Sequence, residues 1–219
     1  MDDLSTLQQI TIWILPILFA ITVHEAAHGW AAFKLGDDTA KQLGRITLNP
    51  IKHIDPIGTI LLPLVLLVVS AGKFVFGWAK PVPVDFNRLR NFRRDMALVA
   101  LAGPAANLLM VILWLLVAKF GAFIMESFEF TDAIFLIYMS FAGVIINTLL
   151  MVLNLFPILP LDGGRVLHSL LPPDLAESYA RLEPYGIILL VALILLDVLQ
   201  MVLLPILGIV QQFFVWFIA

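Results

Sequence analysis

The chain has 219 residues, of which 61% are hydrophobic and 13% are charged, about half the charged share of an ordinary soluble domain. Its formal net charge is −3 at pH 7, and it has no basic tail of the kind that binds nucleic acid. It contains no cysteine, which excludes disulfides and thiol chemistry and leaves nitrogen and oxygen atoms as ligands for any metal.

Four long stretches carry almost no charge. Spanning about 30 Å of hydrocarbon takes roughly 20 apolar residues in a helix, and each stretch reaches that length. The sequence therefore predicts an all-α polytopic membrane protein with about four to six transmembrane helices. The stretches are residues 10–33, 96–118, 133–161 and 184–219, interrupted by His24, Glu25, His28 and Asp197.

The first predicted crossing, near residues 8–34, contains HEAAH at residues 24–28. On a helix, His24 and His28 project from one face, so both imidazoles can bind one zinc ion. Glu25 lies about a quarter-turn away, within reach of a water molecule on that zinc. Zinc lowers the pKa of such a water from about 15.7 towards 7, and a nearby carboxylate can pass its proton to a leaving amine. A chance match is the alternative, but burying an acid in a membrane is costly, so HEAAH predicts a metalloprotease site.

The next apolar segment, residues 56–72, is short and contains Pro63. If it dips into the membrane and returns, its flanking loops share one face with the loop at 157–183, and that face then holds twelve of the thirteen Lys and Arg residues. Because positive charge gathers on the cytoplasmic side, we expect a re-entrant segment, an amino terminus outside, and these loops in the cytoplasm. A short helix buried in the loops would satisfy the same count.

Two cytoplasmic segments have strand-like sequences, LGRITLNP at 43–50 and FGWAKPVPV at 76–84. Pro81 and Pro83 exclude a helix and a central strand in the second. We therefore expect an edge or an extended segment there. One hypothesis is that this segment clamps an extended substrate by β-addition, and the alternative is an inert loop.

The later crossings are expected near 96–119, 133–156 and 184–204, while the segment after Pro205 either returns through the membrane or lies along it. Gly103 and Asn107 are expected to serve helix packing rather than the site, since small residues and Asn favour close contact between membrane helices. Asp197, within an apolar stretch, is a hypothetical gate or polar partner.

A catalytic zinc generally has three protein ligands, so HEAAH needs one more. The predicted helix at 133–156 runs in the same direction as the first, and it therefore delivers Asp162 to the side of the membrane on which the histidines lie. Gly163 and Gly164 permit a sharp turn directly after it. Asp162 is thus the expected third ligand. The other candidates weighed are His53, His168, Asp55 and Asp197.

HEAAH near the amino terminus, followed by NLFPILPLDGG at 154–164, resembles the site-2 protease family of intramembrane zinc metalloproteases. GRITLNP, DPIGTI, GWAKPVPV and LAGPAANL resemble compact members that lack a PDZ domain, and the likeness extends over residues 21–165. The resemblance implies that His24, His28 and Asp162 bind one zinc ion per chain and that Glu25 is the general base. It also implies that Asn154 holds the substrate carbonyl or its oxyanion.

These features together predict one transmembrane metalloprotease domain over residues 1–219, with a catalytic core at about 8–165 and carboxy-terminal helices at 184–219. The expected function is zinc-dependent cleavage of peptide bonds in or near transmembrane segments, in regulated intramembrane proteolysis. The expected partners are a membrane-protein substrate and the lipid bilayer of the plasma membrane, with the site opening to the cytoplasm through a polar cavity. The alternatives are a non-proteolytic metal-binding membrane protein or transporter, and a catalytically silent scaffold.

Overall fold

The computed structural model describes residues 4–69 and 77–219, which form helices and no strand. Ser5 begins the first helix with a capping box, in which its side chain accepts a hydrogen bond from Gln8 N. The α-helices are α1 (Thr6–Leu35), α2 (Thr39–Gln42), α3 (Leu62–Val69), α4 (Phe92–Phe128), α5 (Ile134–Asn154), α6 (Asp162–Leu170), α7 (Pro173–Ala180), α8 (Gly186–Leu195) and α9 (Val198–Ile218). A π-helix (Pro56–Leu61) leads into α3, and short 3-10 helices lie at Pro50–His53, Phe86–Arg88, Thr131–Ala133 and Glu183–Tyr185.

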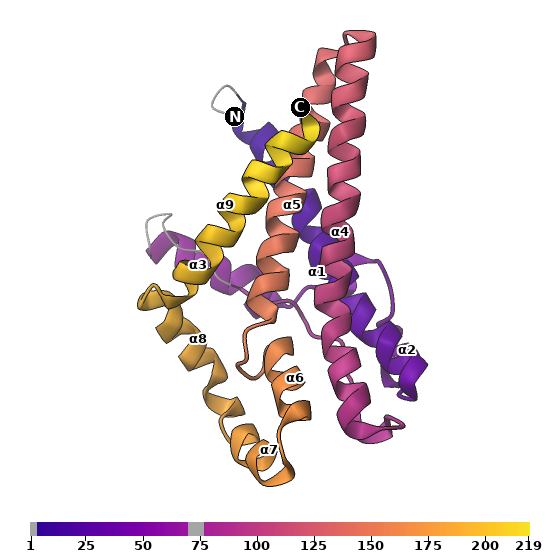
Figure 1. Cartoon of the computed structure of the whole chain (residues 1–219), viewed down its shortest axis with the longest axis vertical. Coiled ribbons are helices and arrows are strands. Elements are labelled where there is room, and N and C mark those ends of the chain that lie inside the picture. Colours follow the sequence, from indigo (N-terminus) through magenta and orange to yellow (C-terminus); the bar gives the residue numbers. More distant parts are fainter. Residues whose placement is uncertain (1–3, 70–76) are drawn as a thin grey trace.

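The long helices α1, α4 and α5 pack together as the centre of the molecule. α1 and α5 run in one direction and α4 in the other, and α9 leans against α5 and α4 (Figure 1). Small residues permit the close approach. A Cβ atom on Gly143 of α5, for example, would collide with the indole ring of Trp114 on α4. As predicted, the first helix and the helix at 134–154 therefore reach the same end of the bundle.

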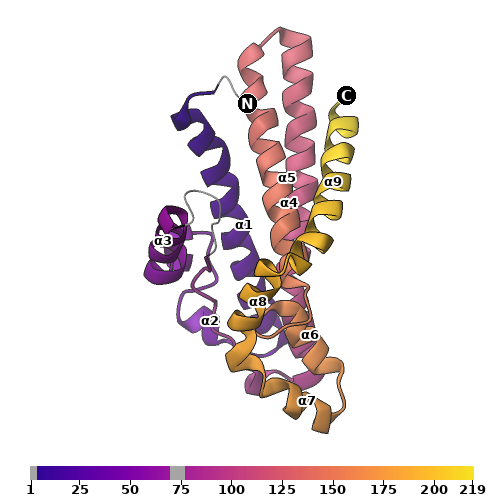
Figure 2. The ribbon, with the colours of Figure 1, turned by 90° about the vertical axis from the view of Figure 1, so that its left-hand side faces the viewer.

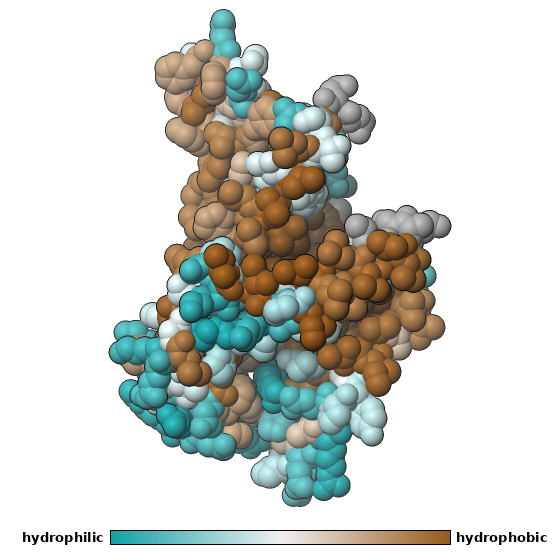
Figure 3. All heavy atoms as spheres, turned by 180° about the vertical axis from the view of Figure 1, so that it is seen from behind, coloured by the Kyte–Doolittle hydropathy of each residue, from teal (hydrophilic) through white to brown (hydrophobic). Residues whose placement is uncertain are grey.

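The described residues include five helical stretches long and apolar enough to cross a membrane. Hydrophobic side chains cover the middle of the molecule, while hydrophilic ones gather at the end where α2 and α7 lie (Figure 3). These features are those of an integral membrane protein and confirm the predicted class. The stretches are Thr6–Leu35, Phe92–Phe128, Thr131–Asn154, Pro173–Leu195 and Val198–Ile218.

The segment that begins at Pro56 lies beside the bundle, with α3 directed across the long axis (Figures 1 and 2). Trp78 N donates to Gly58 O at 3.0 Å, and Thr59 Oγ1 donates to Trp78 O at 2.8 Å. The chain therefore leaves and comes back at the same level, as a segment that does not cross requires. Residues 70–76, which include the end of the predicted re-entrant segment, lie outside the described residues.

Neither strand-like segment joins a sheet within the described chain. Residues 43–50 form turns and bends before the 3-10 helix that begins at Pro50. Residues 77–85 contain no helix, turn or bend, and the N–H groups of alternate residues, Trp78 and Lys80, donate to Gly58 O at 3.0 Å and to His53 O at 2.9 Å. This agrees with the expected extended segment, because Pro81 and Pro83 lack the N–H groups that continue a ladder. Residue 76 lies outside the described part.

The predicted helix at 184–204 is wrong in its boundaries. Asp197 adopts a left-handed conformation, with φ of 59°, which ends α8 at Leu195 and starts α9 at Val198. Asp tolerates this conformation better than most residues. Pro205 lies inside α9 and does not end it, because membrane helices accommodate proline. α8 and α9 both run away from α7, so the carboxy terminus lies at the same end as the amino terminus (Figure 1).

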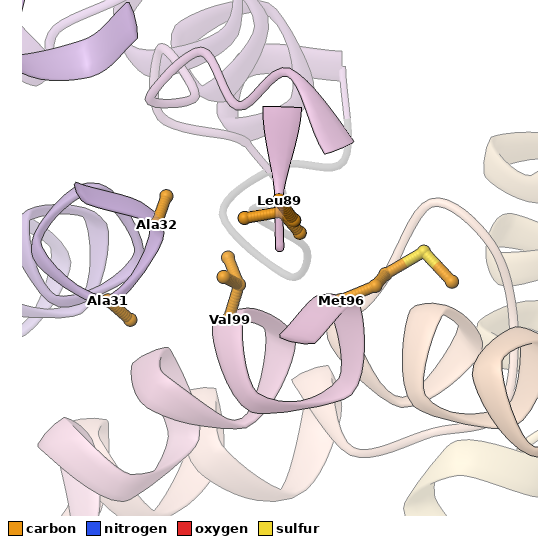
Figure 4. Packing of buried hydrophobic residues seen from close by; sticks show 5 residues of the cluster. All are labelled: Ala31, Ala32, Leu89, Met96 and Val99. Atoms are coloured by element: carbon orange, nitrogen blue, oxygen red, sulfur yellow. The ribbon is translucent and has the colours of Figure 1, made fainter. Parts of the chain in front are cut away.

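A small hydrophobic cluster joins α1 to α4 beside HEAAH. Ala31 and Ala32 on α1 are buried with Met96 and Val99 on α4 and with Leu89 from the preceding loop. Figure 4 shows Leu89 directed towards α4, with Val99 between it and α1. Alanine has no side chain beyond Cβ, so α1 approaches α4 closely here, and the last turns of α1 are fixed in place.

A candidate metal centre between α1, α4 and α6

His24 and His28 project from the same face of α1 towards α4, as their i, i+4 spacing predicts. Their Nε2 atoms are 3.0 Å apart, and His24 is buried. Gly103 of α4 lies directly against both rings, since a Cβ atom there would collide with His28 Nε2 and His24 Nε2. The absence of a side chain at Gly103 therefore makes room for the two imidazoles between the helices.

Asp162 reaches the histidines from the first turn of α6. After α5 ends at Asn154, the chain turns back through residues 155–161. Gly163 and Gly164 then lie against the backbone of Leu155 and Ile158, where a Cβ atom would collide. One carboxylate oxygen of Asp162 lies 3.3 Å from His24 Nε2 and the other lies 3.3 Å from His28 Nε2. The structure thus brings together the three residues that the sequence analysis selected as ligands.

The hydrogen bonds of the two imidazoles fix their tautomers. His24 Nδ1 lies 2.6 Å from Asn107 Oδ1, and His28 Nδ1 lies 2.8 Å from Val99 O. Both oxygens are acceptors, so both Nδ1 atoms carry the proton and both Nε2 atoms present lone pairs. In the neutral imidazoles, two nitrogen lone pairs therefore face the Asp162 carboxylate, an arrangement suited to binding a cation.

The spacing of these atoms fits zinc. Ligands bound at 2.0–2.1 Å in a tetrahedral site lie about 3.3–3.4 Å apart, close to the separations of 3.0, 3.3 and 3.3 Å observed. Among the described residues, Oδ2 of Asp162 is buried without a hydrogen-bond donor, as expected for an atom that binds a metal. Two histidines and one carboxylate form a known set of catalytic zinc ligands, so the residues present fit this ion.

Glu25 lines the same cleft as His24, His28 and Asp162, and a loop residue holds its side chain. Val82 N donates to Glu25 Oε2 at 2.7 Å. The Val82 side chain is buried against Gly29, whose Cβ would lie 2.9 Å from Val82 Cγ1. Arg45 in turn donates to Lys80 O at 2.9 Å. The Val82 N–H is therefore directed to the carboxylate and does not lie free at an edge.

A cleft of about 370 Å³ is lined by His24, His28 and Asp162. Asn154 forms part of its wall, and its amide nitrogen donates to Leu150 O at 2.9 Å. Arg165, which the sequence analysis did not select, also lines the cleft and pairs with Glu183. The lining residues are His24, Glu25, His28, Pro81, Val82, Val84, Phe86, Val99, Ala100, Asn154, Pro160, Leu161, Asp162 and Arg165.

Relatives named as zinc metalloproteases match most of the chain. It is 37% identical to "Putative zinc metalloprotease YwhC" of Bacillus subtilis, over 89% of this chain and 85% of that protein. It is 30% identical to "Putative zinc metalloprotease Rip2" of Mycolicibacterium smegmatis, over 91% of this chain and 73% of that protein. No family model matches the chain, and no solved structure matches it.

The chain belongs to the site-2 protease family of zinc metalloproteases. Membership agrees with the geometry, because the ligands that resemblance to the site-2 proteases implied are those that the structure brings together. The match covers nearly the whole chain, so it also includes α4 and α5, which carry the asparagines described below.

The other residues considered as metal ligands lie away from His24, His28 and Asp162, and their contacts are structural. His53 is buried and its Nε2 lies 3.0 Å from Thr47 O, while Asp55 accepts hydrogen bonds from Ile57 N and Gly58 N at the start of the π-helix. Burial and the guanidinium groups of Arg165 and Arg93 lower the pKa of His168. This imidazole is therefore neutral at pH 7.

Two residues of α4, Gly103 and Asn107, do more than the helix packing predicted for them. Gly103 and Asn107 were expected to serve packing, and they do pack, but Gly103 contacts both histidines and Asn107 binds His24. Asn147 on α5, which was not singled out, binds Asn107 at 2.9 Å. The available signal was their polarity, since polar residues inside apolar helices are costly unless they serve a purpose.

Proposed function

We propose that the protein is a zinc-dependent intramembrane endopeptidase that cleaves peptide bonds in or near the transmembrane segments of membrane proteins. The observation that carries the proposal is the group of His24, His28 and Asp162, with Glu25 beside it, at the base of a cleft in helices apolar enough to span a membrane. The roles assigned to these residues, with one zinc ion per chain, are part of the proposal.

In the proposed reaction, His24, His28 and Asp162 hold the zinc ion, which when bound acidifies water and polarises the scissile carbonyl. Glu25 takes the proton of the attacking water through the oxygen that Val82 does not occupy, and passes it to the leaving amine. Asn154, in the cleft wall, donates its amide N–H groups to the carbonyl oxygen as negative charge develops there. Asn154 then has to turn from Leu150 O, to which it now donates.

The proposed setting is the plasma membrane, with the amino terminus outside and the cleft open to the cytoplasm. Support comes from the charge distribution, since twelve of the thirteen Lys and Arg residues lie in segments assigned to one face. The cleft is lined in part by Pro81, Val82 and Val84, from a loop assigned to that same face, which supports a route for water to Glu25. The proposed role is regulated intramembrane proteolysis of a substrate that has a transmembrane helix.

The test uses the full chain in detergent with a membrane-helix substrate, and compares wild type with Glu25→Gln. Loss of a general base costs about 10²–10⁴-fold in rate, while the zinc content measured by elemental analysis should stay the same. Glu126→Gln, the same chemical change at an exposed position in the last turns of α4, is the matched control and should cleave like wild type.

Cleavage by Glu25→Gln at the wild-type rate would overturn the assignment of the base. A wild type that binds zinc and cleaves none of a panel of membrane-helix substrates would overturn the protease proposal. That second outcome is the one expected of a metal-binding membrane protein or transporter.

A further inference from the structure

Two asparagines form a buried polar pair where α1, α4 and α5 meet. Asn107 on α4 and Asn147 on α5 both have 0% exposed surface. Polar amides inside an apolar interface cost free energy unless their donors and acceptors are paired. The direction in which these groups are paired determines what the pair presents to its surroundings.

The hydrogen bonds of the pair run in one direction, from α5 towards His24. Asn147 Nδ2 donates to Gly143 O at 2.8 Å, which leaves Asn147 Oδ1 to accept from Asn107 Nδ2 at 2.9 Å. Asn107 Nδ2 also approaches Ala20 O at 3.4 Å. The oxygen of Asn107 therefore has to face His24. Turning this amide over would place its oxygen against two other oxygens.

This orientation has a direct consequence at His24. An oxygen 2.6 Å from Nδ1 requires the proton on Nδ1, which keeps the Nε2 lone pair available and fixes the plane of the ring. Val99 O fixes the proton and the ring plane of His28 in the same way, and this backbone oxygen is held in place by α4. A side-chain amide can rotate, and Asn147 restrains Asn107 as the helix restrains Val99 O.

We propose that Asn107 is a positioning residue for His24, and that Asn147 acts through Asn107. The pair selects the tautomer of His24 and directs its Nε2 to the metal. This inference rests on the role of His24 as a metal ligand in the proposed function, and it does not depend on proteolysis. Partners of this kind typically contribute about 10–100-fold to metal affinity or activity.

The experiment titrates the metal-free full chain in detergent with Co²⁺, follows the visible absorption of the bound ion, and confirms the order of affinities by Zn²⁺ competition. Asn107→Ala should weaken Co²⁺ binding about 10–100-fold. Asn107→Asp keeps an acceptor opposite Nδ1 but places its second oxygen against Asn147 Oδ1 and Ala20 O, so it should bind Co²⁺ more tightly than Asn107→Ala without reaching wild type. If Asn107→Ala does not fold, Asn107→Leu, which fills a similar volume, provides the same comparison.

The coupling of the two asparagines is tested by the double variant. Asn147→Ala alone should weaken Co²⁺ binding less than Asn107→Ala does. In the Asn107→Ala background it should have no further effect on affinity, because its influence passes through Asn107. Ser140→Ala, which removes another fully buried polar group from α5, is the matched control and should bind Co²⁺ like wild type.

A role in helix packing alone would lower the thermal midpoint of the metal-free protein and leave the affinity for Co²⁺ unchanged. Wild-type affinity in Asn107→Ala would therefore overturn the proposal, as would a full effect of Asn147→Ala in the Asn107→Ala background. A wild type that binds Co²⁺ and Zn²⁺ but cleaves no substrate would overturn the protease proposal and leave this inference intact.

Discussion

At the scale of single residues, the site is a set of lone pairs directed at one point. Asn107 and Val99 hold the protons of the two imidazoles on the far nitrogens, and Asp162 adds a carboxylate opposite them. Without a cation these three groups repel one another in a buried setting of low dielectric. The folded chain therefore favours positive charge at this point, and a bound metal ion would supply it.

We predict that the metal ion stabilises the folded chain. Removing it with a chelator should lower the thermal midpoint measured in detergent, and adding Zn²⁺ at about 1,000 times its dissociation constant should restore about 4 kcal/mol of stability. A variant with Asp162→Ala should lose most of this metal-dependent shift. An identical midpoint with and without zinc would contradict the prediction.

A second prediction at this scale concerns Gly103. Gly103→Ala places a methyl group against the Nε2 atoms of His24 and His28, so it should displace the rings and abolish cleavage and high-affinity Zn²⁺ binding. Gly208→Ala makes the same change in α9, where a Cβ atom meets nothing within 4 Å. Gly208→Ala should keep wild-type affinity when Zn²⁺ binding to both variants is measured by calorimetric titration. Equal affinities for the two variants would show that the rings adapt.

The sequence predicts that His24, His28 and Asp162 lie close together, as the structure shows, because helical spacing and chain direction carry that information. His24 and His28 share a face by periodicity alone, and Asp162 follows from the parity of the crossings. The sequence does not predict that Asn107 turns its oxygen to His24, because that depends on Asn147 and on Gly143 O in another helix. Contacts between helices arise from tertiary packing, which has no local pattern.

At the scale of elements, the extended segment at 77–85 makes hydrogen bonds both to Glu25 on α1 and to Asp37 just after α1. Asp37, directly after α1, is fully buried and accepts hydrogen bonds from Thr39 N at 3.0 Å and from Asp85 N at 2.8 Å. Asp85 closes the segment that carries Val82. The position of Val82 N–H relative to Glu25 thus depends on a carboxylate outside the cleft.

We predict a pH-dependent contribution of Asp37 to stability. Burial raises the pKa of Asp37, but hydrogen bonds from Thr39 and Asp85 and the charge of Arg88 outweigh burial and lower it. A lowered pKa stabilises the fold at neutral pH, and this contribution is lost as the pH falls through the folded-state value. Asp37→Asn should therefore cost about 1–3 kcal/mol at pH 7, and the difference from wild type should shrink below about pH 4.

The measurement is thermal or denaturant unfolding in detergent across that pH range. Asp38→Asn, the same change in a neighbouring carboxylate that is 47% exposed and pairs with Arg88, should cost less than about 1 kcal/mol. A stability difference between Asp37→Asn and wild type that grows as the pH falls would contradict the predicted direction of the pKa shift of Asp37.

At the scale of the whole molecule, hydropathy and charge counts predict the membrane class and the shared direction of α1 and α5. They fail at the carboxy terminus, where Pro205 was taken as the break and Asp197 is the break instead. α8 has ten residues, about 15 Å, while α9 has 21 and is long enough to span the hydrocarbon. Hydropathy cannot separate the two because both are apolar throughout.

The resulting topology predicts that both termini lie outside the cell. The chain has no cysteine, so single cysteines can be introduced without background. Ser5→Cys and Ala219→Cys should react with a membrane-impermeant maleimide on intact cells, while Ser178→Cys in α7 should react only after permeabilisation. Labelling of Ala219→Cys only after permeabilisation would place the carboxy terminus in the cytoplasm and contradict the arrangement.

The hydrogen bond from Val82 N to Glu25 affects how mutational data on this protein should be interpreted. A change at Arg45 or Asp37, which touch no ligand, alters the setting of the extended segment and hence the orientation of the carboxylate. Such variants would retain zinc and fold yet lose rate, the signature usually taken to mark a residue of the active site. Residues that act only by orienting Glu25 can be recognised by combining each variant with Glu25→Gln, because such variants should add no further loss of rate once this carboxylate is removed.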